Sequence, residues 1–363
     1  MASSLNLTAG QLIPPRPPLP VPVPTGTGRL LEFFEQFQPG DPAYEAAQRA
    51  RQYAAQADNA ATKRAYATDW RLFTEWCASR SLPVFPSTPE VVAMYISDMA
   101  ASGKIKSATI TKKLAAISKV HEWGGFPSPS TMQNPNLQTV ARGIRKSLGT
   151  KQAAKDPISL ELIRRMIDNE DGVPLAIARN RALILVGFAT GMRRSELAAL
   201  QVEHLHERNS GFQIEVPRSK TDQEGKGREV EIVYGSQPED TSPAILTCPV
   251  RALKRWLLQA AIGKGPVFRK VNKYGEKEAK ALHPDSIGWI IKQSLSRAGV
   301  RPQQLWRYGA HSLRAGFATT AYQNGVPELK IRKQTGHQSA RMLERYIRGV
   351  DKARQEAAGS LGL

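Results

Sequence analysis

Three short clusters in the second half of the sequence combine basic side chains with a possible nucleophile and possible proton carriers. They are "ATGMRRSELAAL" (189–200), "PRSKTDQEGKG" (217–227), and "HSLRAGF" (311–317) followed by "GHQSARMLERY" (336–346). The candidate residues in them are, in chain order, Arg193, Glu196, Lys220, His311, Arg314, His337 and Tyr346. A surface arginine, a turn lysine or a lone histidine is common by itself, but the ordered set is much less expected by chance.

Two arginines and a tyrosine suit an attack on a phosphodiester, which is a poor electrophile. The transition state carries extra negative charge, and Arg193 and Arg314 could bind the nonbridging oxygens bidentately in place of a metal ion. A free phenol has a pKa near 10, so roughly one in a thousand is ionised at neutral pH, and nearby cations favour the phenolate. Attack by Tyr346 would give a covalent phosphotyrosine link, which stores the bond energy for religation without ATP, a metal or another cofactor.

The remaining candidates fit proton transfer and phosphate binding. His311, three residues before Arg314 on the same helical face, could take part in proton transfer at the nucleophile. Lys220, where a strand enters a turn, could supply the proton that the leaving 5′-hydroxyl oxygen needs. His337 could donate a hydrogen bond to the phosphate. We expect no metal site, because the sequence offers no carboxylate cluster for a cation such as Mg²⁺.

A basic strip surrounds the tyrosine in "GHQSARMLERYIRGV" (336–350). On a helix Arg341, Arg345 and Arg348 fall at i, i+4 and i+7 and therefore share one face, with Tyr346 at its edge. The tyrosine could pack while the arginines keep the helix soluble, or a negatively charged polymer could lie on this face. The net charge of +19 favours the polymer, because lysines and arginines that neutralise phosphates release counterions. We therefore expect the strip to face nucleic acid.

Length and composition narrow the class of protein. The 363 residues suffice for about two to three domains with a sizeable core, and 41% of them are hydrophobic. Cys77 and Cys248 lie far apart and form no C-x-x-C motif, which argues against a disulfide scaffold or a zinc ribbon. No apolar run approaches about 18 residues, and no signal peptide opens the chain. We therefore expect a cytoplasmic protein without a membrane partner.

The chain divides into four predicted segments. Residues 1–42 form a leader in which "PPRPPLPVPVP" holds seven prolines in eleven positions, a composition typical of disorder or polyproline II. Residues 43–148 show helical periodicity without a convincing strand, and the polar stretch 149–157 is typical of a linker. Residues 158–363 mix helices with "FQIEVP" and "REVEIVY", which alternate like the strands of a hairpin. The predicted fold is therefore mainly α, with a small β-sheet in the second domain.

With these residues in this order, the chain resembles a tyrosine recombinase of the phage integrase family, of the simple Cre-like type. The resemblance covers about residues 43–363, is strongest from 180 to 350, and depends on T-G-x-R, the hairpin lysine, H-x-x-R, Gly-His and the late tyrosine. It implies that Arg193 and Arg314 bind the phosphate, that Glu196 supports the first of these arginines, and that Tyr346 is the nucleophile. It also implies that Lys220 is the hairpin lysine and His311 the first histidine. His337 would occupy the position that holds His or Trp in the family.

The resemblance further implies a site-specific DNA recombinase that works through a 3′-phosphotyrosine intermediate and a Holliday junction. A helical core-binding domain (43–148) and a mixed α+β catalytic domain (158–363) would clamp double-stranded DNA at inverted-repeat target sites. Four protomers would exchange strands in pairs as a homotetramer, with each tail (351–363) packed into a neighbour.

Two other functions remain as alternatives. One is a type IB topoisomerase-like enzyme that relaxes supercoils without sequence choice, and the other is a DNA-binding protein without activity. The helical first domain and the short chain after Tyr346 favour recombination over relaxation. A protein that only binds DNA has no reason to keep the complete residue set.

Overall fold

The computed structural model describes residues 33–56, 60–131, 133–149, 155–217, 227–235, 247–340, 342–344 and 346. The chain forms two compact units, Met1–Gln152 and Ala153–Leu363. Several predictions fall outside the described residues: those for positions 1–32 of the leader, for Lys220, for Arg341, Arg345 and Arg348, and for the tail 351–363. The finer domain limits at 43, 148 and 158 stay predictions.

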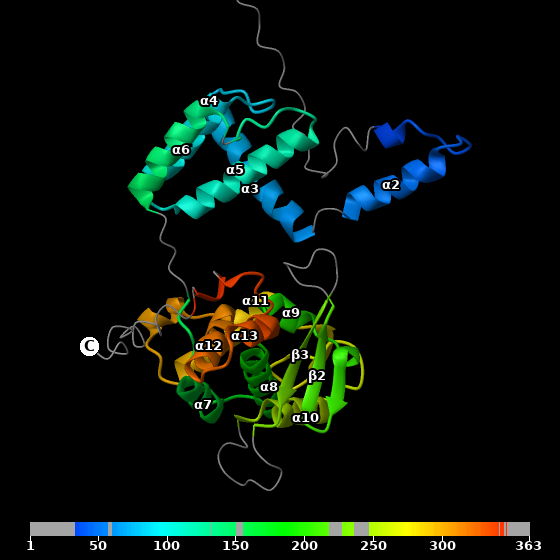
Figure 1. The fold of residues 1–363 in the computed structure, drawn as a ribbon, viewed down its shortest axis with the longest axis vertical. Coiled ribbons are helices and arrows are strands. Elements are labelled where there is room, and N and C mark those ends of the chain that lie inside the picture. The colour runs from blue at the N-terminus through cyan, green and yellow to red at the C-terminus, as the bar shows by residue number, and fades with distance from the viewer. Residues whose placement is uncertain are drawn as a thin grey trace, which may run out of the picture. The chain divides into compact units, whose positions relative to one another are not determined.

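Helices build the described part of the first unit (Figure 1). They are α2 (Tyr44–Gln56), α3 (Ala60–Ala78), α4 (Pro89–Ala101), α5 (Ser107–Trp123) and α6 (Pro135–Leu148). Polar side chains fix two of the helix starts. Thr88 caps α4 by accepting a hydrogen bond from the N–H of Val91, and Asn134 caps α6 in the same way. The prediction of helices without strands is confirmed for the described residues of this unit.

Aromatic side chains form the core of the first unit. Trp70, Phe73 and Cys77 of α3 recur at helical spacing, and all three are buried against α4 and α5. The rings of Phe73 and Tyr95 meet edge to face with their centroids 5.1 Å apart. Burial of this large apolar surface holds the helices together without a sheet.

The second unit mixes helices with two small sheets. Its elements are α7 (Leu160–Asp168), α8 (Pro174–Thr190), α9 (Arg194–Ala199), η1 (Val202–His204), β1 (Leu205–Arg208), β2 (Gly211–Val216), β3 (Arg228–Val233), α10 (Pro249–Gln259), β4 (Arg269–Val271), β5 (Lys277–Ala281), α11 (Pro284–Arg297), η3 (Pro302–Arg307), α12 (Ala310–Gln323) and α13 (Glu328–Thr335). None of the described helices is long and apolar enough to cross a membrane.

Both sheets are antiparallel. The larger one has the strand order β1-β2-β3, and the smaller one pairs β4 with β5. Phe212 lies opposite Ile232 and Ile214 lies opposite Val230, so one face of β2 and β3 is apolar and buried. The hairpin predicted from alternation is therefore confirmed as β2 and β3. The sequence did not predict β1, β4 and β5, which are short and mostly polar.

Helix α8 is the central helix of the second unit. Residues 182–186 are all apolar and buried, so this stretch of the helix is apolar around its whole circumference. Such a helix has to be surrounded by protein, and α10 and α12 pack against it (Figure 1). Because α12 carries His311 and Arg314, this packing fixes the helix that presents two of the candidate residues.

The backbone that enters the second unit lies against α12. The N–H of Ile158 donates a hydrogen bond to the carbonyl oxygen of Ser312 (3.1 Å), and the N–H of Asp156 donates to that of Arg307 (2.9 Å). Gly316 permits the close approach, since an ideal Cβ there would stand 2.1 Å from the carbonyl oxygen of Ile158. Residues 156–158 are thereby fixed to the start of α12.

Replacing Gly316 by alanine should destabilise the protein, because the added methyl group would overlap the backbone of Ile158 and the ring of Phe188. We expect the free energy of unfolding to fall by about 1–3 kcal/mol, the usual range for overpacking. The matched control is Gly288→Ala in α11, where an added Cβ would meet nothing within 4 Å. That control should be neutral or stabilising by up to about 1 kcal/mol. Urea denaturation measures both, and equal stabilities would contradict the close approach.

Candidate active site

Six of the seven candidate side chains lie in the described part of the second unit, and the structure brings them together. They come from three places: the start of α9 (Arg193, Glu196), the start of α12 (His311, Arg314), and the chain after α13 (His337, Tyr346). Hydrogen bonds and ring contacts link these places. The seventh candidate, Lys220, falls outside the described residues.

A glycine turn at the end of α8 positions the first arginine. Gly191 adopts a left-handed conformation (φ 58°, ψ 23°) that ends the helix. The hydroxyl of Thr190 accepts a hydrogen bond from the N–H of Met192 (3.3 Å). The carbonyl oxygen of Gly191 accepts one from Nη1 of Arg314 (2.8 Å). The Thr-Gly pair therefore serves both arginines, because it leads the chain to Arg193 and supplies an acceptor for Arg314.

Glu196 holds Arg193 through two hydrogen bonds. Its Oε1 accepts from Nη1 of Arg193 (2.7 Å), and its Oε2 accepts from the backbone N–H of the same residue (3.0 Å). Only 2% of the carboxylate side chain is exposed. Burial by itself would raise the pKa of Glu196, but the charge of Arg228 and the hydrogen bonds from Arg193 lower it below its ordinary value. Glu196 is therefore ionised at neutral pH and orients the guanidinium.

Arg314 is among the largest fully buried side chains of the described residues. Its Nη1 donates to the carbonyl oxygens of Gly191 and Thr335, and its Nε donates to Nε2 of His337 (3.3 Å). Burial, followed by repulsion from Arg193, lowers the pKa of Arg314 to about 10. The guanidinium is still charged at neutral pH, so two cations meet at this site.

His337 is buried and neutral. Burial, followed by the charges of Arg314 and Arg193, lowers the pKa of His337 to about 3. Since Nε2 accepts from Arg314, the proton of the ring lies on Nδ1, which donates to the hydroxyl of Thr335 (2.8 Å). In this tautomer Nε2 carries no proton, so it can donate to a phosphate only after Arg314 releases it and Nε2 gains a proton. The predicted phosphate contact of His337 stays a prediction that requires such a change.

Tyr346 contacts both histidines. Its hydroxyl is hydrogen-bonded to Nε2 of His311, and its ring lies against His337 with centroids 5.3 Å apart. Its ring also packs against a small apolar cluster that includes Ile331 and Leu343. Packing and a chemical role are therefore compatible for this residue, because its ring makes the packing contacts while its hydroxyl bonds to His311.

His311 is placed to accept the phenolic proton. Burial of part of the ring, followed by the charges of Arg314 and Arg193, lowers the pKa of His311 below its ordinary value. The residue as a whole remains exposed to solvent, which limits the size of this shift. A neutral imidazole with its proton on Nδ1 can accept the phenolic proton at Nε2, as general-base catalysis needs.

The structure adds one residue that the sequence analysis missed. Arg228, the first residue of β3, donates from Nη2 to Oε2 of Glu196 (2.7 Å) and from Nη1 to the carbonyl oxygen of Gln334 (2.6 Å). Its side chain is 15% exposed. A lone arginine after a turn carries no signal of such a contact, because Glu196 and Gln334 approach it only in the folded chain.

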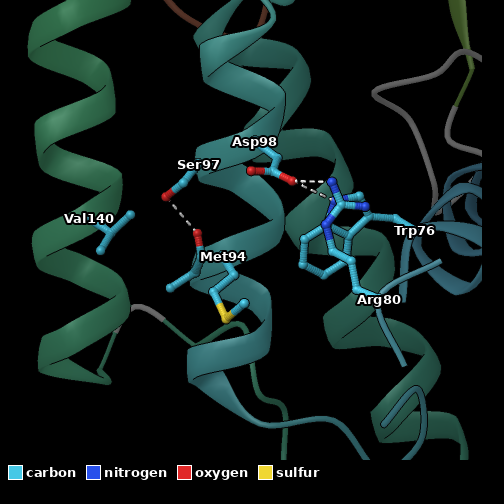
Figure 2. Close-up of a pocket in the computed structure, with 7 residues that line it drawn as sticks. Trp76, Arg80, Met94, Ser97, Asp98 and Val140 are labelled. Carbon is cyan, nitrogen blue, oxygen red and sulfur yellow. Dashed lines mark hydrogen bonds and ion pairs between the residues drawn. The ribbon is translucent and has the colours of Figure 1, made fainter. Parts of the chain in front are cut away.

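A hollow in the first unit has a different character (Figure 2). It has a volume of about 310 Å³ and is lined by residues of α3, α4 and α6 and by Arg80, which follows α3. Asp98 accepts hydrogen bonds from Arg80 (2.6 Å) and from the indole of Trp76 (3.0 Å), so these polar groups satisfy one another. It shares no residue with the candidate site. Nowhere among the described residues do three His, Cys, Asp or Glu side chains form a group that could hold a metal ion.

Comparisons with known proteins bear on the same part of the chain. The model of the phage integrase family matches residues 159–352. An "Integrase/recombinase xerD homolog" of Selenomonas ruminantium is 37% identical over 295 residues, which cover 80% of this chain and 82% of that protein. "Recombinase cre" of Escherichia phage P1 is 25% identical over 298 residues, which cover 77% of this chain and 82% of that protein.

One solved structure is similar over most of the chain. It is the XerH site-specific recombinase bound to a palindromic difH substrate in a post-cleavage complex. The two folds superpose with a TM-score of 0.62 at 20% sequence identity, covering 94% of this chain and 96% of that chain. The predicted fold class, mainly helical with a small sheet in the second unit, is thereby confirmed.

Neutral His337 should make the protein less stable in acid. Its folded-state pKa of about 3 lies below the ordinary value near 6.5, so the unfolded chain binds the proton first, and stability falls as the pH drops from 6.5 towards 3. A His337→Gln variant lacks this titration. Between pH 7 and pH 5 the wild type should lose about 2 kcal/mol more than the variant in the free energy of unfolding. Urea denaturation at both pH values measures it, and equal losses would contradict a neutral His337.

Proposed function

Since this chain belongs to the phage integrase family, we propose that it is a site-specific DNA recombinase of the tyrosine type. It cuts and rejoins DNA strands through a covalent phosphotyrosine intermediate. The observation that carries the proposal is the hydrogen bond between Tyr346 and His311 beside two buried or half-buried arginines. A nucleophile, a base and two phosphate-binding cations thus meet at one place.

The reaction follows from these positions. Arg193 and Arg314 bind the nonbridging oxygens of one phosphodiester and stabilise the charge that develops on them. The hydroxyl of Tyr346 attacks the phosphorus and gives its proton to Nε2 of His311. The bond from phosphorus to the 5′-oxygen breaks, which leaves the 3′-phosphate on the tyrosine. The leaving oxygen takes a proton, for which Lys220 remains the proposed donor.

Religation reverses the same steps with a different strand. The 5′-hydroxyl of that strand attacks the phosphotyrosine, and the phenolate of Tyr346 leaves and recovers its proton. The number of phosphodiester bonds does not change, so no ATP is needed. Strand exchange between two duplexes in this way passes through a Holliday junction, which we propose as the intermediate.

The partner that we propose is double-stranded DNA with inverted-repeat target sites, bound by a homotetramer. The net charge of +19 supports a polyanionic partner. The similar XerH structure is of a recombinase bound to a palindromic substrate, which supports the inverted repeat. We further propose that residues 43–148 bind the DNA core, that 158–363 are catalytic, and that the protein acts in the cytoplasm.

Tyr346→Phe should bind target DNA but form no covalent adduct, because the phenyl ring keeps the packing and lacks the attacking oxygen. Capture of protein–DNA adducts across the genome of a cell that makes the protein measures this, and it reports the cleaved sequence. Wild-type adducts should gather at few sequences with inverted repeats. Tyr274→Phe, at an exposed tyrosine of the same unit, is the control and should keep the adducts. Normal adduct yield from Tyr346→Phe would refute the nucleophile, and adducts without sequence preference would favour relaxation of supercoils.

Cleavage should need no divalent metal, because the two arginines supply positive charge at the phosphate. We expect the same yield of adduct in excess EDTA as in Mg²⁺, measured on a nicked duplex of the captured sequence. A yield that disappears in the chelator and returns with Mg²⁺ would contradict this mechanism.

A further inference from the structure

Arg228 and Arg193 share one carboxylate. Glu196 accepts from Arg193 at both oxygens, and Arg228 adds a third hydrogen bond at Oε2. Two guanidinium groups and one carboxylate leave this trio with a net positive charge. Without Arg228, the whole charge of Glu196 would act on Arg193 alone. The remaining pair, Arg193 and Glu196, would then be neutral, at a place where positive charge stabilises a reacting phosphate.

Arg228 also contacts the turn that leads to His337. Its Nη1 donates to the carbonyl oxygen of Gln334, and Nη2 of Arg193 lies 3.4 Å from that of Gly336. Gly336 has a positive φ of 70°, and an ideal Cβ there would stand 2.8 Å from Nε of Arg228. The two arginines therefore hold the same short stretch of backbone from two sides.

The burial of Arg228 is costly, and packing alone does not account for it. Burial of a guanidinium removes its hydration, and Nε of Arg228 is a buried N–H for which the described residues offer no acceptor. An apolar side chain at the start of β3 would avoid this cost. The contacts of the guanidinium lead to two parts of the candidate site, Glu196 with Arg193 and the turn before His337.

We propose that Arg228 is a positioning residue for DNA cleavage. It shares the carboxylate of Glu196, and so it keeps the charge of Arg193 available to the phosphate while it fixes the turn before His337. The inference rests on the proposed function, because it assigns Arg228 a part in that reaction. Arg228 itself touches neither the nucleophile nor the base among the described contacts.

A double-mutant cycle separates this role from simple packing. Arg228→Gln, Glu196→Gln and the double variant are compared by the single-turnover rate of adduct formation on a nicked duplex of the captured sequence. Arg228→Gln should slow the adduct about tenfold or more. Its affinity for the same duplex, measured with Tyr346→Phe added, should change by less than about threefold, since the variant spares the ground-state contacts.

The double variant gives the decisive comparison. Removing the carboxylate as well restores a net positive charge to the trio. The adduct rate of the double variant should therefore be more than about threefold faster than the rate expected if the two single effects multiplied. Arg228→Lys, which keeps the charge but cannot contact Glu196 and Gln334 together, should lie between the wild type and Arg228→Gln. The proposal would be overturned if the adduct rate of the double variant lay within about threefold of that expected rate. It would also be overturned if Arg228→Gln formed the adduct at the wild-type rate.

Arg297→Gln is the matched control for stability. Arg297 also pairs with a buried carboxylate of the second unit, that of Glu170 (3.2 Å), and neither residue belongs to the candidate site. The control should lower the melting temperature and leave the adduct rate unchanged, when all rates are measured below the melting temperature. An equal slowing in both variants would mean that Arg228 is structural. Absence of adduct from the wild type would instead refute the proposed function, and this inference with it.

Discussion

The guanidinium groups of Arg193 and Arg228 meet at the carboxylate of Glu196, close to the guanidinium of Arg314. The arrangement of the second unit around the candidate site depends on holding these charges together. Charges this close repel one another, so each needs fixed acceptors before folding can be favourable. Glu196 supplies two oxygens, and the last residues of α8 and α13 supply backbone carbonyls that their own helices leave unpaired. Helix C-termini carry partial negative charge, which suits cations. The points where α8 and α13 end are thereby tied to the positions of the arginines.

Burial, together with the same concentration of charge, decides the state of both histidines. Burial disfavours a charged imidazole and lowers the pKa of both rings, and the two neighbouring arginines lower it further. Neutral His311 can accept a hydrogen bond from the phenol when its proton lies on Nδ1, and neutral His337 accepts one from Arg314. The same burial and charge thus act on the proposed base and, through Arg314, on one of the proposed phosphate-binding groups. The two imidazoles differ in their hydrogen-bond partners rather than in their charge.

Much of this site could be predicted from the sequence, because several of its parts are local. The Thr-Gly turn, the three-residue spacing of His311 and Arg314, and the alternation of β2 and β3 each depend on neighbours in the chain. Arg228 could not be predicted, since its partners lie 32 and 106 residues away. The tautomer of His337 depends likewise on Arg314 and Thr335 together. The basic strip around Tyr346 and the role of Lys220 stay predictions.

The attachment of residues 156–158 to α12 has a mechanical consequence. The carbonyl that receives the N–H of Ile158 belongs to Ser312, which directly follows His311 and lies two residues before Arg314. Gly316 lets residues 156–158 lie against the helix without an intervening side chain. A pull on the chain that joins the two units would act within one helical turn of His311, the proposed base, and of Arg314, a proposed phosphate-binding residue. Because this attachment lies so close to His311 and Arg314, tension in the chain that joins the two units would reach the candidate site directly.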